Sequence, residues 1–356
     1  MAQHPNFAAL LPAVSQTWRA DIARWLAYDL PKPVHHAHAH PSRCSTGSRS
    51  HRTRACTFFR PRFDYGGFVV GSAPRTARLL GKSPGVLAGV PFVDEVFRQV
   101  GGCTVTWHRA EGSVITEADA RAKRCVATVA GPADRLLQGE RTALNVLSRA
   151  SGVATAARRC ADIAARHGWH GSVAGTRKTT PGFAVVEKYA LLVGGGATHR
   201  MDLSAMLMLK DNHIWSNAQR QGAGLNAGGA ATRDADAAAV AAVTDCVRHA
   251  KRATGFSTKI EVECRSLEEA FAGGAAGADV VMLDNFGPEG LKKVAAQVKA
   301  RYPHLVIEAS GGITADTMAA FFSPHVDVIS QGKLTHGYGV LDFSLKIDRG
   351  VMAARL

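Results

Sequence analysis

The sequence predicts a two-domain α/β protein, in which a small N-terminal α/β domain precedes an open, six-stranded TIM-like α/β barrel. Two observations carry this prediction. Beyond Val173 short apolar runs alternate with helical segments, as in parallel sheets with right-handed crossovers. Polar residues follow the ends of these runs, as they do on the active-site rim of a TIM barrel. Six runs instead of eight indicate an incomplete or open barrel.

Length and composition indicate an ordinary globular enzyme. A chain of 356 residues can bury two modest cores. No apolar run approaches the roughly 18 residues of a membrane span, and the first residues lack the basic and apolar regions of a secretory signal. The seven cysteines form no CxxC pair, so we expect reduced thiols and a cytoplasmic location.

The net charge of +14 is unevenly distributed. Residues 31–62 carry seven basic residues and no acidic one, which accounts for half of the net charge. The remaining charge suits small anionic substrates as well as it suits a polyanion. No stretch interleaves aromatic side chains with Arg or Lys, as single-strand binders do. We therefore expect no nucleic-acid partner, although the charge alone leaves that alternative open.

The first domain is predicted to span residues 1–150. Apolar residues at helical spacing indicate helices within residues 1–30. Residues 31–62 are rich in His, Arg, Ser and Pro and lack periodicity, so we expect a disordered insertion or a translated intron. Strands are expected at 104–108 and 124–131, and a short helix at 91–100.

Gly131 and Pro132 break the chain before a helix expected over residues 133–150. Arg141 shares an apolar face of this helix with Leu137 and Leu144. Such an arginine either snorkels to solvent or reaches into a site or a partner subunit. The pattern alone leaves both interpretations open.

The barrel is predicted to span residues 151–336, with residues 337–356 after it. An Ala/Gly-rich stretch at 217–239 is longer than a βα connection needs, so we expect a surface insertion before a helix at 240–253. The six expected strands are residues 172–174, 205–209, 259–264, 280–283, 306–309 and 326–330.

Basic side chains gather between Gly175 and His213, where they follow apolar strands. They are Arg177, Lys178, His199, Arg200 and Lys210. Holding such groups together is costly without an anion between them, which predicts a pocket for a small, multiply negative ligand. The alternative is that each cation lies on a separate solvated face.

Two acids, Glu263 and Asp284, end neighbouring strands among these cations. They could orient Mg²⁺ and sugar hydroxyls or stabilise a cationic sugar carbon, or one could simply pair with Lys210 or Lys178. The turns EASGGIT (308–314) and SQG (330–332) resemble the phosphate cradle on the last two strands of such barrels. Together these features suit transfer from a phosphorylated sugar to an anionic acceptor.

The motifs GTRKTTPGF, KDNH, IEVEC, MLDNF, EASGGI and ISQG, with the His199-Arg200 pair, resemble the quinolinate phosphoribosyltransferase family. KSPGVLAGVPF and GERTALN extend the resemblance into the first domain, and it omits only residues 31–62 and about 217–239. The resemblance implies that quinolinate and phosphoribosyl pyrophosphate give nicotinate mononucleotide, pyrophosphate and CO₂ with Mg²⁺, in NAD biosynthesis. It also implies an N-terminal α/β sandwich to which residues 337–356 return.

The resemblance also implies roles for single residues. Arg177, Lys178, His199, Arg200 and Lys210 would surround the quinolinate carboxylates and the pyrophosphate. Arg141 would enter from the neighbouring subunit of a homodimer, with a hexamer as a larger alternative. Glu263 and Asp284 would serve the ribose and, directly or indirectly, the magnesium. Ser310, Gly311, Gly312 and Gly332 would hold the 5′-phosphate, and the candidate catalytic residues are Lys178, Lys210, Glu263 and Asp284.

Two alternative enzymatic activities also remain compatible with these residues. A Schiff-base aldolase could use Lys178 or Lys210 as its nucleophile, but it would need a lysine isolated in an apolar pocket. Nicotinate could replace quinolinate as the acceptor, although a monocarboxylate does not explain so many cations.

Overall fold

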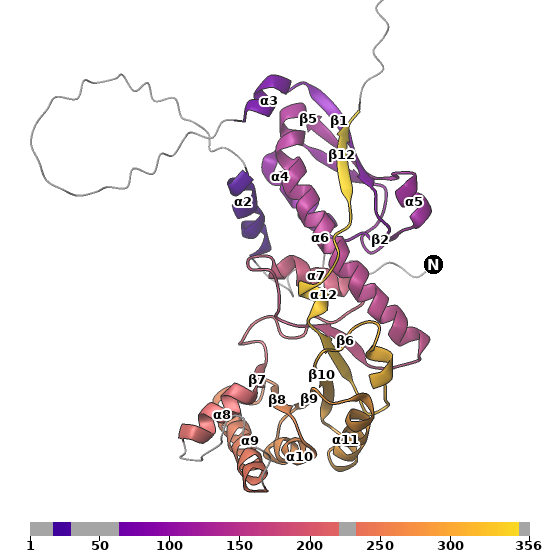
Figure 1. Ribbon diagram of the computed structural model, residues 1–356. Helices are drawn as coiled ribbons and strands as arrows, with labels where there is room; N and C mark the ends of the chain where they lie inside the picture. Colours follow the sequence, from indigo (N-terminus) through magenta and orange to yellow (C-terminus); the bar gives the residue numbers. More distant parts are fainter. Residues whose placement is uncertain (1–16, 30–63, 221–232, 349–356) are drawn as a thin grey trace, which may run out of the picture.

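The computed structural model of the chain describes residues 17–29, 64–220 and 233–348 and shows two lobes joined by one long helix (Figure 1). The disorder predicted for residues 31–62 lies outside the described residues, as do residues 349–356. Among the described helices, none combines the length and apolar character that crossing a bilayer requires.

The N-terminal lobe is built on an antiparallel sheet. Its strand order is β12 (Phe343–Ile347), β1 (Pro74–Gly81), β5 (Cys125–Pro132) and β3 (Thr104–Trp107). The predicted strands at 104–108 and 124–131 are confirmed as β3 and β5, whereas β1 had not been predicted. Its buried Ala77 and Leu79 alternate with exposed residues, which is the period of a half-buried strand. The sheet thus joins the end of the described chain to its N-terminal lobe.

Helices cover this sheet and reach toward the second lobe. Helix α4 (Val90–Val100) packs on α6 (Ala133–Arg166), and α2 (Trp18–Asp29) packs on both. The ring of Trp18 lies edge-on to Phe92 with centroids 5.5 Å apart. The smaller elements of this lobe are α3 (Tyr65–Val70), β2 (Gly85–Val86), β4 (Val114–Ile115) and α5 (Glu117–Arg121).

Helix α6 is much longer than the predicted 133–150, because it continues without a break to Arg166. It contains no proline, and its glycines are sites of close packing. A Cβ at Gly152 would lie 2.0 Å from the carbonyl oxygen of Gly339, so only glycine permits this approach of the C-terminal segment. The predicted domain boundary at 150 therefore falls inside a continuous helix.

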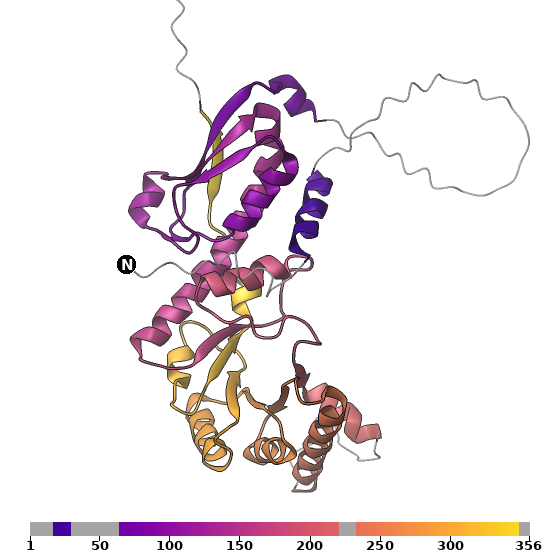
Figure 2. The same cartoon turned by 180° about the vertical axis from the view of Figure 1, so that it is seen from behind.

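The second lobe holds a six-stranded parallel sheet, seen from behind in Figure 2. All six predicted strands are present, in the spatial order β6 (Ser172–Gly175), β11 (Val328–Gln331), β10 (Val306–Ser310), β9 (Val280–Asp284), β8 (Ile260–Cys264) and β7 (Leu207–Leu209). Strands β6 and β7 follow each other in the chain but form the two edges of the sheet. The barrel is therefore open between them, which confirms the predicted fold class.

Helices connect these strands, and one of them corrects the predicted insertion. They are α7 (Ala184–Val193), α8 (Asp211–Arg220), α9 (Arg233–Thr254), α10 (Leu267–Ala276), α11 (Pro288–Arg301), the short η2 (Met318–Phe321) and α12 (Lys333–His336). The predicted insertion at 217–239 is wrong at both ends, because α8 extends to Arg220 and α9 already begins at Arg233. Alanine favours the helical conformation, so the Ala-rich residues 233–239 form the first turns of α9 instead of a loop. Residues 221–232 lie outside the described part of the chain.

Candidate active site

A cavity of about 480 Å³ lies where the parallel strands end at their carboxyl side. In this sheet Ser310 on β10 lies beside Asp284 on β9, and Glu263 on β8 lies beside Met282. Eight predicted site residues line the cavity, namely Lys178, Lys210, Glu263, Asp284, Ser310, Gly311, Gly312 and Gly332. Sequence positions more than 150 residues apart are thus brought to one rim.

Charge alternates inside the cavity. The ammonium group of Lys210, at the end of β7, forms an ion pair with the carboxylate of Glu263 on β8. Asp284 lies beside them and accepts a hydrogen bond of 2.5 Å from the side-chain amide of Asn285. Burial raises the pKa of Asp284, and the nearby Glu263 raises it further, while Lys210, a Ser310 hydrogen bond and Lys178 counteract this. The two carboxylates therefore repel each other across a rim that is otherwise basic.

The turn after β10 brings backbone close to the cavity. The backbone N–H of Asn285 donates to the carbonyl of Ser310 over 3.1 Å. Gly311 has a φ of +100°, and a Cβ there would lie 2.6 Å from the backbone nitrogen of Asn285. Gly312 follows with a φ of +63°. Glycines are needed for this left-handed turn, which exposes backbone as phosphate-binding loops do.

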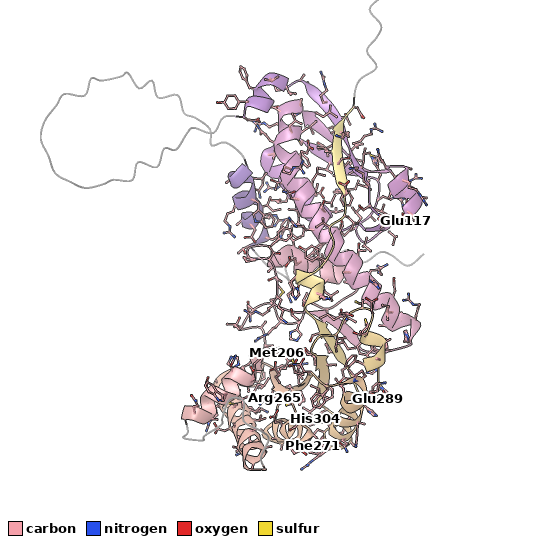
Figure 3. The ribbon with its side chains drawn as sticks, viewed as in Figure 1. Glu117, Met206, Arg265, Phe271, Glu289 and His304 are labelled. Atoms are coloured by element: carbon pink, nitrogen blue, oxygen red, sulfur yellow. The ribbon has the colours of Figure 1, made fainter. Side chains whose placement is uncertain are left out.

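Two of the three predicted arginines, Arg177 and Arg200, are not among the residues that line the cavity. Arg177 is exposed just after β6, and the guanidinium of Arg200 donates to the carbonyl of Met206 over 3.2 Å. Met206, labelled in Figure 3, lies in the loop that leads into β7. Burial lowers the pKa of Arg200, and repulsion from Arg177 lowers it further. Two guanidinium groups that repel each other would be stabilised by an anion between them.

His199, which the resemblance also places at the quinolinate carboxylates, is mostly buried. Its side chain is 8% exposed and lies inside the barrel, outside the lining of the cavity. Nε2 lies 3.0 Å from Glu308 Oε2 and 3.7 Å from Glu261 Oε2, while Nδ1 accepts a hydrogen bond of 2.8 Å from the backbone N–H of Arg200. Because Nδ1 accepts this hydrogen bond, Nε2 is the ring nitrogen that can donate to a carboxylate.

The buried glutamates Glu261 and Glu308 were missed by sequence reasoning. Each is an acid inside an apolar strand, IEVEC or VIEAS, and that unusual placement was the available signal. Burial raises the pKa of Glu261, and the neighbouring Glu308 raises it further. With His199 they offer ligand atoms within 4.8 Å of one another, so within the described residues this trio could also hold a metal ion.

The cavity includes further residues that were given no role of their own from the sequence, although most of them belong to the predicted motifs. Asn285 sits in MLDNF directly after Asp284, and Lys333 and His336 follow the last strand on α12. Their position just beyond the end of a strand was the sequence feature that could have identified them as site residues. The remaining lining residues outside the predicted set are Thr176, Ile313, Thr314 and Ser330.

Comparison with known proteins identifies the family. The description "Quinolinate phosphoribosyl transferase" matches with its C-terminal domain over residues 153–346 and with its N-terminal domain over residues 56–151. The chain is 49% identical over 287 residues to the nicotinate-nucleotide pyrophosphorylase (carboxylating) of Homo sapiens, which covers 81% of this chain and 87% of the human protein. This chain belongs to the quinolinate phosphoribosyl transferase family.

Other members of the family agree in sequence and structure. The protein of the same name from Dictyostelium discoideum is 44% identical over 299 residues, which is 81% of this chain and 92% of that protein. The crystal structure of NadC from Streptococcus pyogenes superposes with a TM-score of 0.67 at 32% identity and covers 80% of this chain and 90% of that chain. A likeness this extensive covers both lobes.

Family membership argues against the aldolase alternative, and so does the geometry. A Schiff-base lysine needs a depressed pKa in an apolar pocket. Lys210 instead pairs with the Glu263 carboxylate, and Lys178 is exposed on the rim. Both lysines are therefore placed to bind anions.

A buried lysine, Lys188 on α7, ties together the two loops that carry the arginines. Its ammonium group donates to the carbonyl of Gly175 over 3.1 Å and to the carbonyl of Thr198. Gly175 precedes Arg177, and Thr198 precedes the His199-Arg200 pair. Burial, and then repulsion from Arg177, lower the pKa of Lys188 to about 8.

The lowered pKa of Lys188 predicts that the folded protein becomes more stable as the pH rises above about 8. Between pH 8 and the unfolded value of 10.5 the unfolded chain binds a proton that the folded chain does not, so stability rises with pH in that window. From pH 7.5 to 9.5 the free energy of unfolding of the wild type should gain about 2 kcal/mol relative to Lys188→Met. Urea denaturation of both proteins at the two pH values measures this. A constant or falling difference would contradict it.

Proposed function

We propose that this family member transfers the phosphoribosyl group of phosphoribosyl pyrophosphate to quinolinate, and that nicotinate mononucleotide, pyrophosphate and CO₂ are released. The observation that carries this proposal is the composition of one cavity. It joins the Gly311-Gly312 turn, the acids Glu263 and Asp284 and the cations Lys178 and Lys210. A phosphorylated sugar and an anionic acceptor each find complementary groups there.

The 5′-phosphate is assigned to the glycine turn. Ser310 ends β10 and is followed by Gly311 and Gly312, and Gly332 follows the neighbouring β11. Glycines let the sugar phosphate approach the backbone N–H groups, and Ser310 adds a hydroxyl donor. The adjoining acids then face the ribose.

Magnesium is the expected ion, and the two acids fit it. Mg²⁺ prefers oxygen ligands and is usually held by one or two carboxylates together with substrate phosphates. Glu263 and Asp284 lie on neighbouring strands of the cavity, and their mutual repulsion would be relieved by a cation. When bound, the ion would neutralise charge on the pyrophosphate.

The chain's own residues support each stage of the reaction by position and charge. Arg177, Arg200, Lys178 and Lys210 would hold the quinolinate carboxylates and orient the ring nitrogen toward the sugar. As pyrophosphate leaves, the carboxylates of Glu263 and Asp284 would stabilise the cationic ribose carbon, which the nitrogen attacks. When the adjacent carboxylate departs as CO₂, its bonding electron pair stays on the ring carbon, where the positive pyridinium nitrogen stabilises it, and that carbon then takes up a proton from solvent.

We assign Arg141 to a partner subunit of a homodimer. The arginine is exposed on α6 in the N-terminal lobe, and it is a described residue that does not line the cavity of its own chain. The cytoplasmic location belongs to the same proposal and is supported by the five cysteines of the described residues, which are all free thiols.

The activity is tested directly with purified protein. Quinolinate, phosphoribosyl pyrophosphate and MgCl₂ should give nicotinate mononucleotide, resolved by chromatography. Product formation should stop in EDTA and return when MgCl₂ is added in excess. A folded protein that forms no product, or forms it equally well in EDTA, would contradict the proposed reaction or its use of magnesium, respectively.

A further inference from the structure

A fully buried carboxylate, Glu187 in the first turn of α7, holds the loop that carries Arg177 and Lys178. Its Oε2 accepts a hydrogen bond of 3.0 Å from the backbone N–H of Thr180, and its Oε1 accepts one of 2.7 Å from the Thr180 hydroxyl. Glu187 is 0% exposed, and so complete a burial of an acid is costly unless several donors hold it. The carboxylate thus fixes the chain two residues beyond Lys178.

A third donor to this carboxylate comes from the segment that follows the last barrel strand. The phenol hydroxyl of Tyr338 donates to Glu187 Oε1 over 2.9 Å, across 151 positions of sequence. Burial, and then the nearby Glu187, raise the pKa of Tyr338 to about 12, so the hydroxyl keeps its proton at neutral pH. Burial also raises the pKa of Glu187, while the hydrogen bonds from Thr180 and Tyr338 and a smaller attraction from Arg149 counteract this. All three donors therefore favour the ionised carboxylate.

The same segment contacts the loop a second time, at Lys178 itself. The buried hydroxyl of Thr335 on α12 donates to the backbone carbonyl of Lys178 over 2.8 Å. The side chain of Lys178 lines the cavity, where its Cδ would lie 3.1 Å from a Cβ placed on Gly332. The backbone of Lys178 is therefore held from behind while its side chain faces the cavity.

The segment that supplies these two hydroxyls is itself fixed on the long helix α6. A Cβ at Gly152 of α6 would lie 2.0 Å from the carbonyl oxygen of Gly339 and 3.1 Å from the ring of Tyr338. Beyond Gly339 the chain enters the N-terminal sheet as β12. The loop is thus tied to the part of the molecule that joins the two lobes.

We propose that Glu187 is a positioning residue, which acts with Tyr338 to hold residues 176–183 so that Lys178 faces a carboxylate of quinolinate. A lysine ammonium group sits on a flexible stem, so its reach depends on where the backbone is held. The proposal rests on the proposed function, because quinolinate is the ligand in its test. The competing interpretation is that the buried carboxylate contributes to folding stability alone.

Single variants test the link by steady-state kinetics. Tyr338→Phe and Thr335→Val each delete one hydroxyl and keep the shape of the side chain, and each should raise the KM for quinolinate about tenfold. Glu187→Leu removes the acceptor and should raise it about 100-fold. The KM for phosphoribosyl pyrophosphate should change by less than about threefold, because its 5′-phosphate is assigned to the glycine turn after β10. Thr335→Ser keeps the hydroxyl and should retain the quinolinate KM of the wild type.

A double variant tests whether the link acts through Lys178. Lys178→Met removes the ammonium group and keeps the backbone carbonyl. Isothermal titration calorimetry with quinolinate should show that Tyr338→Phe causes no further loss of affinity in the Lys178→Met background, because both changes disable one contact. Additive losses would overturn the proposal.

Tyr302→Phe is the matched control for the loss of a phenol hydroxyl. Tyr302 precedes β10 at the end of the sheet opposite the cavity, where its ring packs against Phe271, labelled in Figure 3. This variant should change neither KM. If Glu187→Leu fails to fold, Tyr338→Phe and the two Thr335 variants carry the same comparison.

The proposal and the activity it rests on fail in different ways. If the wild type forms no nicotinate mononucleotide, the proposed function is wrong. If the wild type is active and Tyr338→Phe and Thr335→Val lower the Tm without changing the quinolinate KM, only the positioning role is wrong. Equal increases in both KM values would also contradict it.

Discussion

Replacing Lys210 by methionine is expected to lower kcat/KM for nicotinate mononucleotide formation by about 1,000-fold. The ammonium group lies at the rim of the cavity, where it pairs with Glu263 and faces the space assigned to the two anionic substrates. Methionine keeps most of the side-chain volume but leaves the largely buried Glu263 carboxylate without its counter-ion. That carboxylate would then repel the substrates. Steady-state kinetics with both substrates varied measures the loss.

Lys259→Met is the control, because Lys259 lies at the opposite, N-terminal end of β8 and is exposed. It should retain wild-type kinetics. A loss below about tenfold for Lys210→Met would mean that Lys210 only neutralises Glu263, as an ordinary ion pair does.

Mixing inactive Lys210→Met and Arg141→Ala subunits should restore activity if Arg141 completes the partner's site, because one hybrid cavity then contains both residues.

Substituting Gly311 by alanine is expected to disable the phosphate turn. The added Cβ would meet the Asn285 backbone, with its nitrogen at 2.6 Å and its Cα at 2.8 Å, at a φ of +100°. Backbone cannot move aside as a side-chain tip can, so the turn itself must shift. We expect the free energy of unfolding to fall by about 2 kcal/mol and the KM for phosphoribosyl pyrophosphate to rise about 100-fold.

Gly287→Ala supplies the matched control in the neighbouring loop. Gly287 has a φ of −68°, and a Cβ there would meet no atom within 4 Å. This variant should keep both its stability and its KM. A Gly311→Ala protein with an unchanged KM for phosphoribosyl pyrophosphate would show that the 5′-phosphate binds elsewhere.

The barrel could be predicted because its strands obey a local rule. Each apolar run ends in a polar residue, such as Lys210 after LML or Asp284 after VVML, and both features are visible within a few positions. Parallel pairing then places these ends on one rim, which is why the cavity was predictable. The full length of α6 was not predicted. The predicted helix ended at residue 150, although no proline there stops the helix, which continues to Arg166.

The inner part of the site could not be predicted because it depends on contacts between distant positions. His199 and Glu308 are more than 100 residues apart and meet only after β10 takes its place in the sheet. Sequence gives the residue types but not the tautomer, which follows from the backbone N–H of Arg200. In the sequence His199 was grouped with the neighbouring basic residues, and the contacts of its ring with the buried Glu308 and Glu261 are visible only in the fold.

The most direct test of the whole account is the carbon balance of the reaction. Quinolinate labelled in the carboxylate next to the ring nitrogen should release one CO₂ for each pyrophosphate and each nicotinate mononucleotide formed. Nicotinate offered in parallel, with the same phosphoribosyl pyrophosphate and MgCl₂, should give no product. Pyrophosphate release without labelled CO₂, or efficient use of nicotinate, would contradict a site built for a dicarboxylate.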